Sequence, residues 1–498
     1  MPSEYKNDCG SNEVQQVVPP PMREEIEVEF SEKAHSGVEE WNFNDDTEAQ
    51  GKRPSDLWSE AVTRILETNE FVSWKPSFPL RYPWSPECST EEARAAYEKA
   101  GRDKFITVKF APEDKVRVLS IAQQLRELPE IARVAAVPEI APPHITNAPR
   151  AMSNPLAEPL TGESDQVVIN CSPTVCLTNQ WYLFRCCIPE AWNMSASGHG
   201  VVIADIDWGF DLTHPDLEHT ELSQSMITES INVADGNLLF HGNGVLGLVG
   251  AAVNGQGMAG IAYDASLWAI QAGTGAINSP VVEPEFWVKA INFVVNTPAK
   301  GRKIIILELQ TKGYSNAESI LSINLEIVEA IKAGVIVCVP AGNDSESRDA
   351  GLGDDDIAIK DTGSIVVGAT RFDAKKNIRS GSNGGARVTV YAPGDSESDL
   401  TCGLRGSYRN NFGGTSGATA KVAGVVALML EKNNRLTPEE VRTILHGLRI
   451  RAVDDDDNDV GAFLDAGHAV GAAIAARGTT LTGGTAPGPL PARMERAA

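Results

Sequence analysis

The chain has 498 residues, of which 43 are basic and 67 acidic, so its formal net charge is −24 at pH 7. This length exceeds that of one ordinary domain, and we expect one large domain with accessory sequence. The negative balance repels phosphate backbones and anionic lipid, which argues against nucleic acid and membranes as partners and weakly favours basic peptides.

Targeting and cysteine signals bear on the compartment. The first residues lack the charged and apolar regions of a secretory signal peptide, and no apolar run reaches membrane-spanning length. Eight cysteines are sparse in a chain of this size, and Cys186 and Cys187 are neighbours, so the pattern does not indicate a disulfide framework. We therefore expect a cytoplasmic protein, and secretion by a non-classical route stays open.

Three stretches lack hydrophobic periodicity. Residues 1–55 are acidic and polar and are expected to form a largely disordered tail. Residues 144–180 are rich in Pro, Asn, Ser and Thr and indicate a linker, and residues 476–498 are expected to form a flexible C-terminal tail. The folded parts are therefore expected between these stretches.

The N-terminal region, residues 56–143, contains a predicted small α+β module at about residues 103–143. Apolar residues at 105–110 indicate a strand, and a helix is expected to open at Pro112. The run Ile131–Val137 suits a second strand. The order is therefore strand, helix, strand.

Residues 181–475 predict a large α/β domain with a doubly wound, mostly parallel sheet. From residue 200 onward, apolar runs rich in β-branched residues alternate with helical patterns, which is typical of a parallel sheet covered on both faces. In such sheets the chemistry collects at the carboxyl ends of the strands. The five runs are Val201–Ile206, Leu267–Ile270, Ile304–Leu309, Val335–Val339 and Ile365–Val367.

Short segments after these runs carry residues suited to nucleophilic catalysis. Asp207 follows the first run, His241 begins His-Gly-Asn-Gly, and Ser416 lies in Gly-Thr-Ser-Gly. A serine hydroxyl becomes a good nucleophile when an imidazole takes its proton and a third group orients that imidazole. Ser416, His241 and Asp207 fit these three roles.

A tetrahedral oxygen that gains negative charge needs hydrogen-bond donors already in place. Asn343, which ends Ala-Gly-Asn after the fourth run, and the Ser416 backbone N–H are the candidates for this oxyanion hole. An apolar helical pattern at residues 422–429 follows Ser416, so we expect Ser416 to open a helix whose dipole favours the oxyanion.

These segments, in the order Asp, His, Asn, Ser, resemble the subtilisin-like serine peptidases of family S8, the subtilases. The resemblance covers roughly residues 181–475 and includes the family-like segment Gly461–Ala466. It implies a subtilisin-like fold and a serine protease that hydrolyses peptide bonds through an acyl-enzyme intermediate. It also implies protein or peptide substrates and no required cofactor.

The chain departs from the family pattern at several positions. Trp208 stands where Ser or Thr usually follows the catalytic Asp, and Gly244 stands where a second His is usual. Gly417 and Ala420 replace the usual Met and Pro, and the substrate-flanking strand reads Leu309–Thr311. Cleavage preference therefore does not follow from the resemblance.

A structural calcium is one interpretation of Asp216, because this position binds calcium in some relatives and Asn254 is a candidate ligand. The favoured alternative is an Asp that caps a turn, because a cytoplasmic enzyme would meet little free calcium. His214, beside Pro215, is interpreted as structural, and we expect no metal in the catalytic site.

Two functional alternatives stay open. The module at 103–143 is similar in its strand, helix, strand order to the inhibitory pro-region of the family, but it would equally suit a permanent structural part. The chain as a whole is expected to be an endopeptidase, and the alternative is a catalytically silent protein of the same fold that binds a partner peptide. A peptidase dedicated to one partner is a narrower alternative. The natural substrate, the oligomeric state and the pathway do not follow from the sequence.

Overall fold

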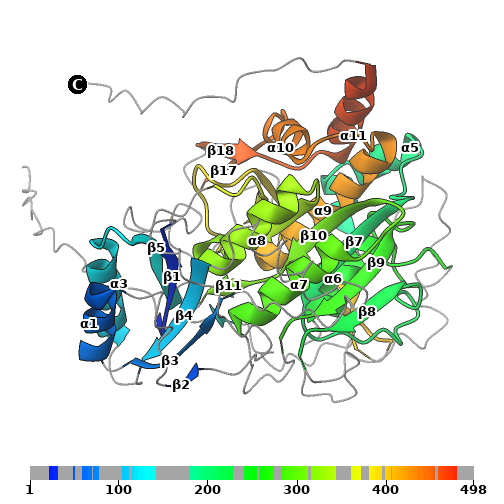
Figure 1. The fold of residues 1–498 in the computed structure, drawn as a ribbon. Coiled ribbons are helices and arrows are strands. Elements are labelled where there is room, and N and C mark those ends of the chain that lie inside the picture. The colour runs from blue at the N-terminus through cyan, green and yellow to red at the C-terminus, as the bar shows by residue number, and fades with distance from the viewer. Residues whose placement is uncertain are drawn as a thin grey trace, which may run out of the picture.

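The computed structural model describes residues 22–31, 49–50, 59–69, 71–77, 104–110, 115–138, 140–141, 180–227, 241–254, 257–273, 283–311, 316–343, 361–371, 381–394, 399–404, 406–454 and 458–478. These residues form a small N-terminal module and a larger α/β part (Figure 1). The predicted linker, apart from Gln180, lies outside the described residues, and so does the predicted C-terminal tail beyond residue 478.

A seven-stranded sheet forms the centre of the larger part, with the order β14-β13-β12-β10-β7-β9-β8. Every pair of neighbouring strands in it is parallel. All five strands expected from the apolar runs are present, which confirms the doubly wound α/β fold class, and β8 and β14 extend the sheet at its two edges. The strands are β7 (Val201–Asp207), β8 (Leu222–Ser225), β9 (Ser266–Gln271), β10 (Arg302–Leu307), β12 (Ile336–Pro340), β13 (Ile365–Thr370) and β14 (Val390–Pro393).

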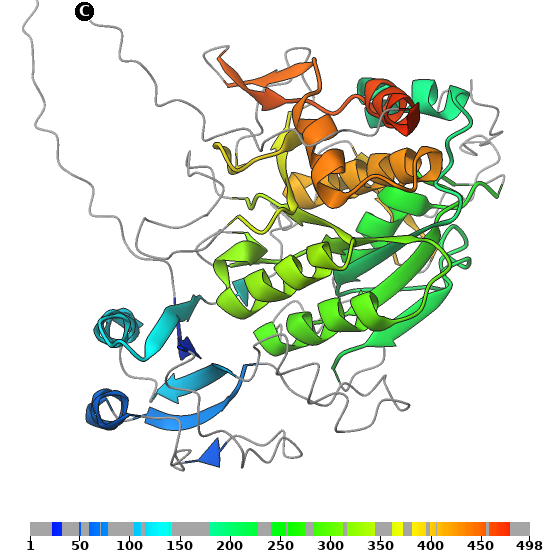
Figure 2. The ribbon, with the colours of Figure 1, turned by 45° about the horizontal axis from the view of Figure 1, so that its top comes forward.

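Helices cover both faces of this sheet (Figures 1 and 2), and the alternation of side chains along each strand separates two cores. Ile203 and Ile304 pack with α6 and α9 on one face, whereas Ile206 and Ile305 pack with α7 and α8 on the other. The helices are α4 (Trp181–Arg185), α5 (Ile188–Asn193), α6 (His241–Gly250), α7 (Pro284–Asn296), α8 (Leu321–Lys332), α9 (Gly414–Lys432), α10 (Pro438–His446) and α11 (Ala466–Ala475). Both faces are therefore dry, and polar side chains on the strands must find partners or stay neutral.

Short strand pairs complete the larger part. Three pairings are antiparallel: β15 (Asp399–Cys402) with β16 (Tyr408–Phe412), β17 (Arg451–Val453) with β18 (Asp459–Ala462), and β11 (Gln310–Thr311) with β6 (Ile140–Ala141) of the N-terminal module.

Within the described part of the chain, none of the helices combines the length and apolar character needed to cross a membrane.

The N-terminal module is a five-stranded sheet of order β2-β3-β4-β1-β5 with two helices on its outer side (Figure 2). Its strand pairs are antiparallel. The strand, helix and strand expected at 103–143 are present as β4, α3 and β5. The elements are β1 (Met22–Phe30), β2 (Ala49–Gln50), α1 (Glu60–Thr68), β3 (Phe71–Pro76), β4 (Phe105–Phe110), α3 (Lys115–Arg126) and β5 (Ile131–Pro138).

The expected tail at residues 1–55 is wrong for residues 22–30, which form β1 in the middle of this sheet, between β4 and β5. The reason lies in a strict alternation that the acidic composition hides. Ile26, Val28 and Phe30 are buried against α1 and α3, whereas the glutamates between them point to the other face. Period-two patterning therefore outweighs local charge in this segment.

The apolar face of β4 is covered inside the module itself. Ile106, Val108 and Phe110 pack in the same core as α1 and α3, and only Phe105 reaches the core of the larger part. Ile106, Val108 and Phe110 therefore need no surface outside the module to cover them. The face of the module that meets the larger part is instead largely polar.

That polar face contacts the starts of two helices. The Glu27 carboxylate accepts a hydrogen bond of 2.8 Å from the Ser322 backbone N–H in the first turn of α8. Lys75 Nζ lies 2.6 Å from the Glu285 carboxylate in the first turn of α7, and Arg23 forms an ion pair with Glu283 beside it. A carboxylate at a helix N-terminus is favourable, so Glu27 acts as an external cap for α8.

A buried ion pair fixes the first turns of α9. Lys421 Nζ lies 2.6 Å from Asp399 Oδ2, and both side chains are fully buried. The same ammonium donates to the carbonyl oxygens of Pro393 and Gly417 at 2.9 and 3.2 Å. A Cβ on Gly417 would lie 3.6 Å from Lys421 Nζ, which is an ordinary van der Waals contact.

We expect Lys421→Met to lower the free energy of unfolding by about 3–5 kcal/mol, because it leaves the Asp399 carboxylate buried without its cation. Denaturant unfolding followed by circular dichroism measures this loss. The double variant Lys421→Met with Asp399→Asn should recover part of it, since no buried charge is then left unpaired. An equal loss in both variants would show that the ion pair is not the cause.

Candidate active site

The residues expected to form a triad lie at the carboxyl edge of the large sheet and at the starts of two helices on one of its faces. Asp207 ends β7, His241 is the first residue of α6, and Ser416 is the third residue of α9. All three are nearly or fully buried. The helices α6 and α9 pack against each other on the face that Asp207 shares with Ile203.

Asp207 holds the imidazole of His241. His241 Nδ1 lies 2.6 Å from Asp207 Oδ2, and the other carboxylate oxygen accepts a hydrogen bond of 2.8 Å from the Trp208 backbone N–H. Burial alone would lower the pKa of His241, but the charge and hydrogen bond of Asp207 overcome it, so this pKa is raised. The imidazole therefore keeps Nε2 as its free acceptor position when Nδ1 carries the proton.

The backbone N–H of Trp208 supplies a hydrogen bond to Asp207 that does not require the Ser or Thr hydroxyl usual in the family. The Trp208 ring is fully buried and packs edge-to-face on Trp287 of α7, with ring centroids 5.7 Å apart. Gly209, next along the chain, has φ of +77°, which turns the backbone away from the strand. The Trp208 side chain therefore fills the second core while its backbone serves the site.

Gly244 stands where the family usually has a second His, and Phe412 fills the space. A Cβ on Gly244 would lie 2.6 Å from Phe412 Cε2, which is too close for any side chain. The same phenyl ring packs edge-to-face on His241 with centroids 5.2 Å apart. The substitution of His by Gly is therefore matched by an aromatic ring from β16 that buttresses His241.

Ser416 lies in the first turn of α9, where backbone N–H groups have no acceptor within the helix. Both side chains belong to the described part of the chain, and within it no hydrogen bond joins the Ser416 hydroxyl to His241. Such bonds are often long before a substrate is bound. The Ser416 hydroxyl does lie close enough to the Glu308 carboxyl to favour its ionised form.

Asn343 is oriented by both ends of its amide. Its Oδ1 accepts from the Thr415 backbone N–H at 3.0 Å, which ties it to the first turn of α9. Its Nδ2 and its backbone N–H both donate to Gln310 Oε1, at 3.2 and 3.3 Å. The amide N–H groups therefore point toward β11, and the structure brings Asn343 next to the segment that carries Ser416.

The motifs did not predict two buried carboxyl groups that lie near Asp207 and His241. Glu308 directly follows β10, and Asp205 lies two residues before Asp207 on β7; both are fully buried. Each interrupts a run predicted as continuous apolar strand. An acid inside such a run was the available signal, because a buried parallel strand rarely carries a charge.

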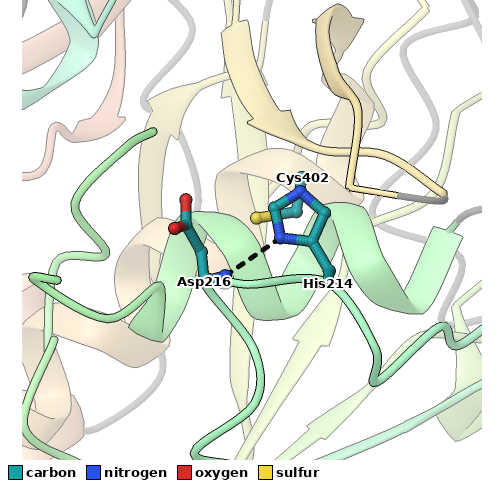
Figure 3. A group of neighbouring side chains, drawn as sticks. All are labelled: His214, Asp216 and Cys402. Atoms are coloured by element: carbon teal, nitrogen blue, oxygen red, sulfur yellow. Dashed lines mark hydrogen bonds between the residues drawn. The ribbon is translucent and has the colours of Figure 1, made fainter. Parts of the chain in front are cut away.

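A second cluster lies around the turn after β7, where His214, Asp216 and Cys402 approach one another (Figure 3). One potential ligand atom of each lies within 4.8 Å of the others. The His214 Nδ1 lone pair accepts from the Asp216 backbone N–H at 3.1 Å, and Nε2 faces the Ser407 carbonyl at 3.0 Å. Burial lowers the pKa of His214 and raises that of the Cys402 thiol. Both ring nitrogens are thus engaged, which suits a structural histidine.

The Asp216 carboxylate is surrounded by donors. Its Oδ1 accepts from Asn254 Nδ2 at 2.9 Å, and its Oδ2 accepts from the Met258 N–H at 3.1 Å and the Tyr408 hydroxyl at 2.9 Å. The Asn254 group that faces Asp216 is an amide donor rather than an oxygen ligand. This geometry fits the turn-capping interpretation of Asp216, and the calcium interpretation stays untested.

Comparisons with known proteins found a matching family and similar sequences. The model of the subtilase family matches residues 198–459. Subtilisin E of Bacillus subtilis (strain 168) is 30% identical over 255 residues, which are 51% of this chain and 61% of that protein. Subtilisin Savinase of Lederbergia lenta is 29% identical over 269 residues, which are 53% of this chain and 89% of that protein. The match thus spans about three-fifths of the length of subtilisin E.

Among solved structures, a protease of Pseudoalteromonas arctica superposes with a TM-score of 0.48 at 22% identity. The superposition covers 59% of this chain and 97% of that one.

The geometry predicts that Asp207→Asn lowers the pKa of His241, because burial then acts without the charge and hydrogen bond of Asp207. An NMR titration of the His241 ring protons measures it. Asp205→Asn removes an equally buried carboxyl from the same strand and should leave that pKa nearly unchanged. Equal shifts in the two variants would contradict a specific Asp207–His241 pair.

Proposed function

Because this chain belongs to the subtilase family, we propose that it is a serine endopeptidase whose triad is Asp207, His241 and Ser416. The observation that carries the proposal is the hydrogen bond of 2.6 Å between His241 Nδ1 and Asp207 Oδ2. An imidazole held in this way presents Nε2 as the proton acceptor that a serine nucleophile requires.

In the proposed reaction, Ser416 Oγ attacks the carbonyl carbon of a peptide bond while His241 Nε2 takes the hydroxyl proton. His241 then gives this proton to the leaving amine, the C–N bond breaks, and the acyl group remains on Ser416 as an ester. A water molecule that loses a proton to His241 hydrolyses the ester and restores the serine. Asp207 stabilises the imidazolium in both halves.

Two donors would receive the negative oxygen of each tetrahedral intermediate. These are the Ser416 N–H, at the positive end of α9, and Asn343 Nδ2. Without substrate, Gln310 Oε1 accepts from Asn343 Nδ2, so a substrate carbonyl oxygen would take the place of this amide oxygen. Loss of one such donor typically lowers turnover by about 10²–10³-fold.

A catalytically silent protein that binds a partner peptide is the second candidate. It is favoured by the lack of a hydrogen bond between Ser416 and His241 among the described residues, and it is opposed by the presence of every triad member. A fluorophosphonate reacts only with an activated serine, so labelling of Ser416 separates the two candidates. Proteome-wide cleavage profiling then separates a peptidase dedicated to one partner from a degradative one.

We expect Ser416→Ala to abolish hydrolysis of casein and of peptide esters, a loss of about 10⁶-fold, because the triad acts as a unit. The fold should survive, as measured by thermal unfolding. Thr415→Val removes a neighbouring buried hydroxyl and is the matched control, which should keep most of the activity. An alanine variant that hydrolyses at the wild-type rate would contradict the assignment of Ser416 as the nucleophile.

We also propose that the N-terminal module acts as a pro-region that restrains the site or assists folding. Its β6 pairs antiparallel with β11, in the register Gln310 with Ala141 and Thr311 with Ile140. The β11 strand carries Gln310, which contacts Asn343, so β6 lies where an extended peptide would be expected to pair. The Glu27 cap on α8 and the ion pairs at the start of α7 support a second point of attachment.

A test of this proposal must include β1, because β1 lies between β4 and β5 and a peptide of residues 95–150 would lack it. We expect residues 181–498 alone to hydrolyse faster than the full chain and to be slowed by added residues 20–143. Alternatively, they would fold only when that module is present, which would support a folding role. Glu27→Ala in the module should weaken either effect, because α8 then loses its cap.

The opposite result is clear-cut. If residues 181–498 fold normally and hydrolyse at the same rate with and without the module, the module is a permanent structural part.

Cytoplasmic residence stays a proposal. It is supported by Cys186, Cys338 and Cys402, which are free thiols within the described part of the chain. A structural calcium at Asp216 would be tested by adding a chelator and measuring the melting temperature, which falls only if an ion is bound there.

A further inference from the structure

Glu308 is a charged residue placed where the strand pattern calls for an apolar one. Its backbone N–H donates to the Ile206 carbonyl at 3.2 Å, so it continues the pairing of β10 with β7 beyond Leu307. Side chains alternate along a strand, and Ile304 and Ile306 face α6 and α9. The Glu308 side chain therefore points to the face on which His241 and Ser416 lie.

The register places the Glu308 carboxyl beside the triad. Ile306 is opposite Asp205, so the next residue on this face, Glu308, comes opposite Asp207. The charges of His241 and Asp207 act on its carboxyl group, and the Ser416 hydroxyl lies near enough to favour the ionised form of that carboxyl. These groups come from β7, α6 and α9. Glu308 is therefore a neighbour of all three triad members.

Glu308 has no other partner to justify its burial. Its side chain is fully buried, and within the described residues neither carboxyl oxygen completes a hydrogen bond of ordinary geometry. An isolated carboxylate in such a place is costly. Burial, opposed by His241 and the Ser416 hydroxyl and reinforced by Asp207, raises the pKa of Glu308 to about 8.

The remaining groups on this face do not offer a counter-charge. Burial, Asp207 and Glu308 raise the pKa of Asp205 well above its ordinary range, which favours its neutral form. Cys338 on β12, opposite Ile306, is a buried thiol whose pKa is raised by burial and by Glu308. Among the described groups whose charges act on Glu308, the base is therefore the His241 imidazole. The carboxyl groups around it are those of Asp205, Asp207 and Glu308.

We propose that Glu308 is a fourth functional residue of this site, a positioning residue that hydrogen-bonds the Ser416 hydroxyl and shares one proton with His241. The inference rests on the proposed peptidase function and adds a residue to it. In the productive form the proton is on Glu308 and His241 is neutral, so His241 accepts from Ser416. When the proton moves to His241, Glu308 becomes a carboxylate and holds the Ser416 hydroxyl unproductively.

This arrangement produces two limbs in the pH dependence of kcat/KM. On the acid side His241 gains a proton while Glu308 is still protonated, so His241 can no longer accept from Ser416. On the alkaline side Glu308 loses its proton, captures the Ser416 hydroxyl and adds a negative charge beside the developing oxyanion. The profile is therefore bell-shaped, with His241 setting the acid limb and Glu308 the alkaline limb.

The decisive variant is Glu308→Gln, which keeps the size of the side chain and removes its charge. Hydrolysis of a chromogenic peptide ester is measured from pH 5 to pH 10 in the full chain. We expect the acid limb to stay near its wild-type position, because Glu308 is neutral there, and the alkaline limb to disappear. Asp205→Asn, which removes a buried carboxyl from the same face, should leave both limbs in place.

A second measurement keeps the inference testable whatever the catalytic rate. The His241 ring protons, followed by NMR, should show a second titration step near the pKa of Glu308, which is lost in Glu308→Gln and kept in Asp205→Asn. Glu308→Met is the substitute if the glutamine variant does not fold, since an apolar side chain of similar length removes an unpaired buried acid. An unchanged His241 titration together with a wild-type pH profile overturns the inference.

Failure of the proposed function would look different. A wild-type chain that neither hydrolyses the ester nor reacts with fluorophosphonate at Ser416 contradicts the peptidase function, and the His241 titration then still decides the role of Glu308. A wild-type chain that reacts at Ser416 while Glu308→Gln leaves profile and titration unchanged overturns only the role of Glu308.

Discussion

The burial of both faces of the parallel sheet is the constraint on which the rest of this structure depends. With α6 and α9 on one face and α7 and α8 on the other, a polar side chain on a central strand has no access to water. Charge is tolerable only where strands end and helices begin, because exposed N–H groups and imidazole or ammonium partners are available there. Asp207, His241, Asn343 and Ser416 all occupy such positions.

The same constraint explains how the module attaches. Helices α7 and α8 start near the edge of the sheet, and their first N–H groups need acceptors. Among the described residues, the N-cap residue of α8, Ile320, makes no side-chain cap hydrogen bond, and the Glu27 carboxylate of β1 accepts from the Ser322 backbone N–H instead. The glutamates of β1 are therefore attachment points rather than signs of a solvated tail, and the isoleucine, valine and phenylalanine between them hold the module together.

Sequence patterns predicted the parts of the site that local order determines. Apolar runs predicted the central strands, and short motifs predicted the candidate triad residues and Asn343, because strand ends in a parallel sheet converge on one edge. The pairing register of strands that are far apart in the sequence cannot be predicted from any short segment. The position of Glu308 beside Asp207 depends on how β10 pairs with β7, and the filling of the Gly244 gap depends on Phe412, which lies far along the chain. The β1 strand escaped prediction because its partners, β4 and β5, come about 80 residues or more later.

The face of the sheet that α6 and α9 cover holds two kinds of buried ionisable group. One kind has a structural role, and the other is better explained by function. Lys421 and Asp399 neutralise each other, and the ammonium has further acceptors in two backbone carbonyls, so burial costs are offset by fixed contacts. Glu308 has the same degree of burial without such compensation. A carboxyl that only filled space would be more stable as a leucine or methionine, since nothing in the fold requires its oxygens. The presence of Glu308 beside Ser416 and His241 is therefore better explained by proton chemistry than by packing. The unfavourable free energy of burying its carboxyl group is accepted for function and does not stabilise the fold.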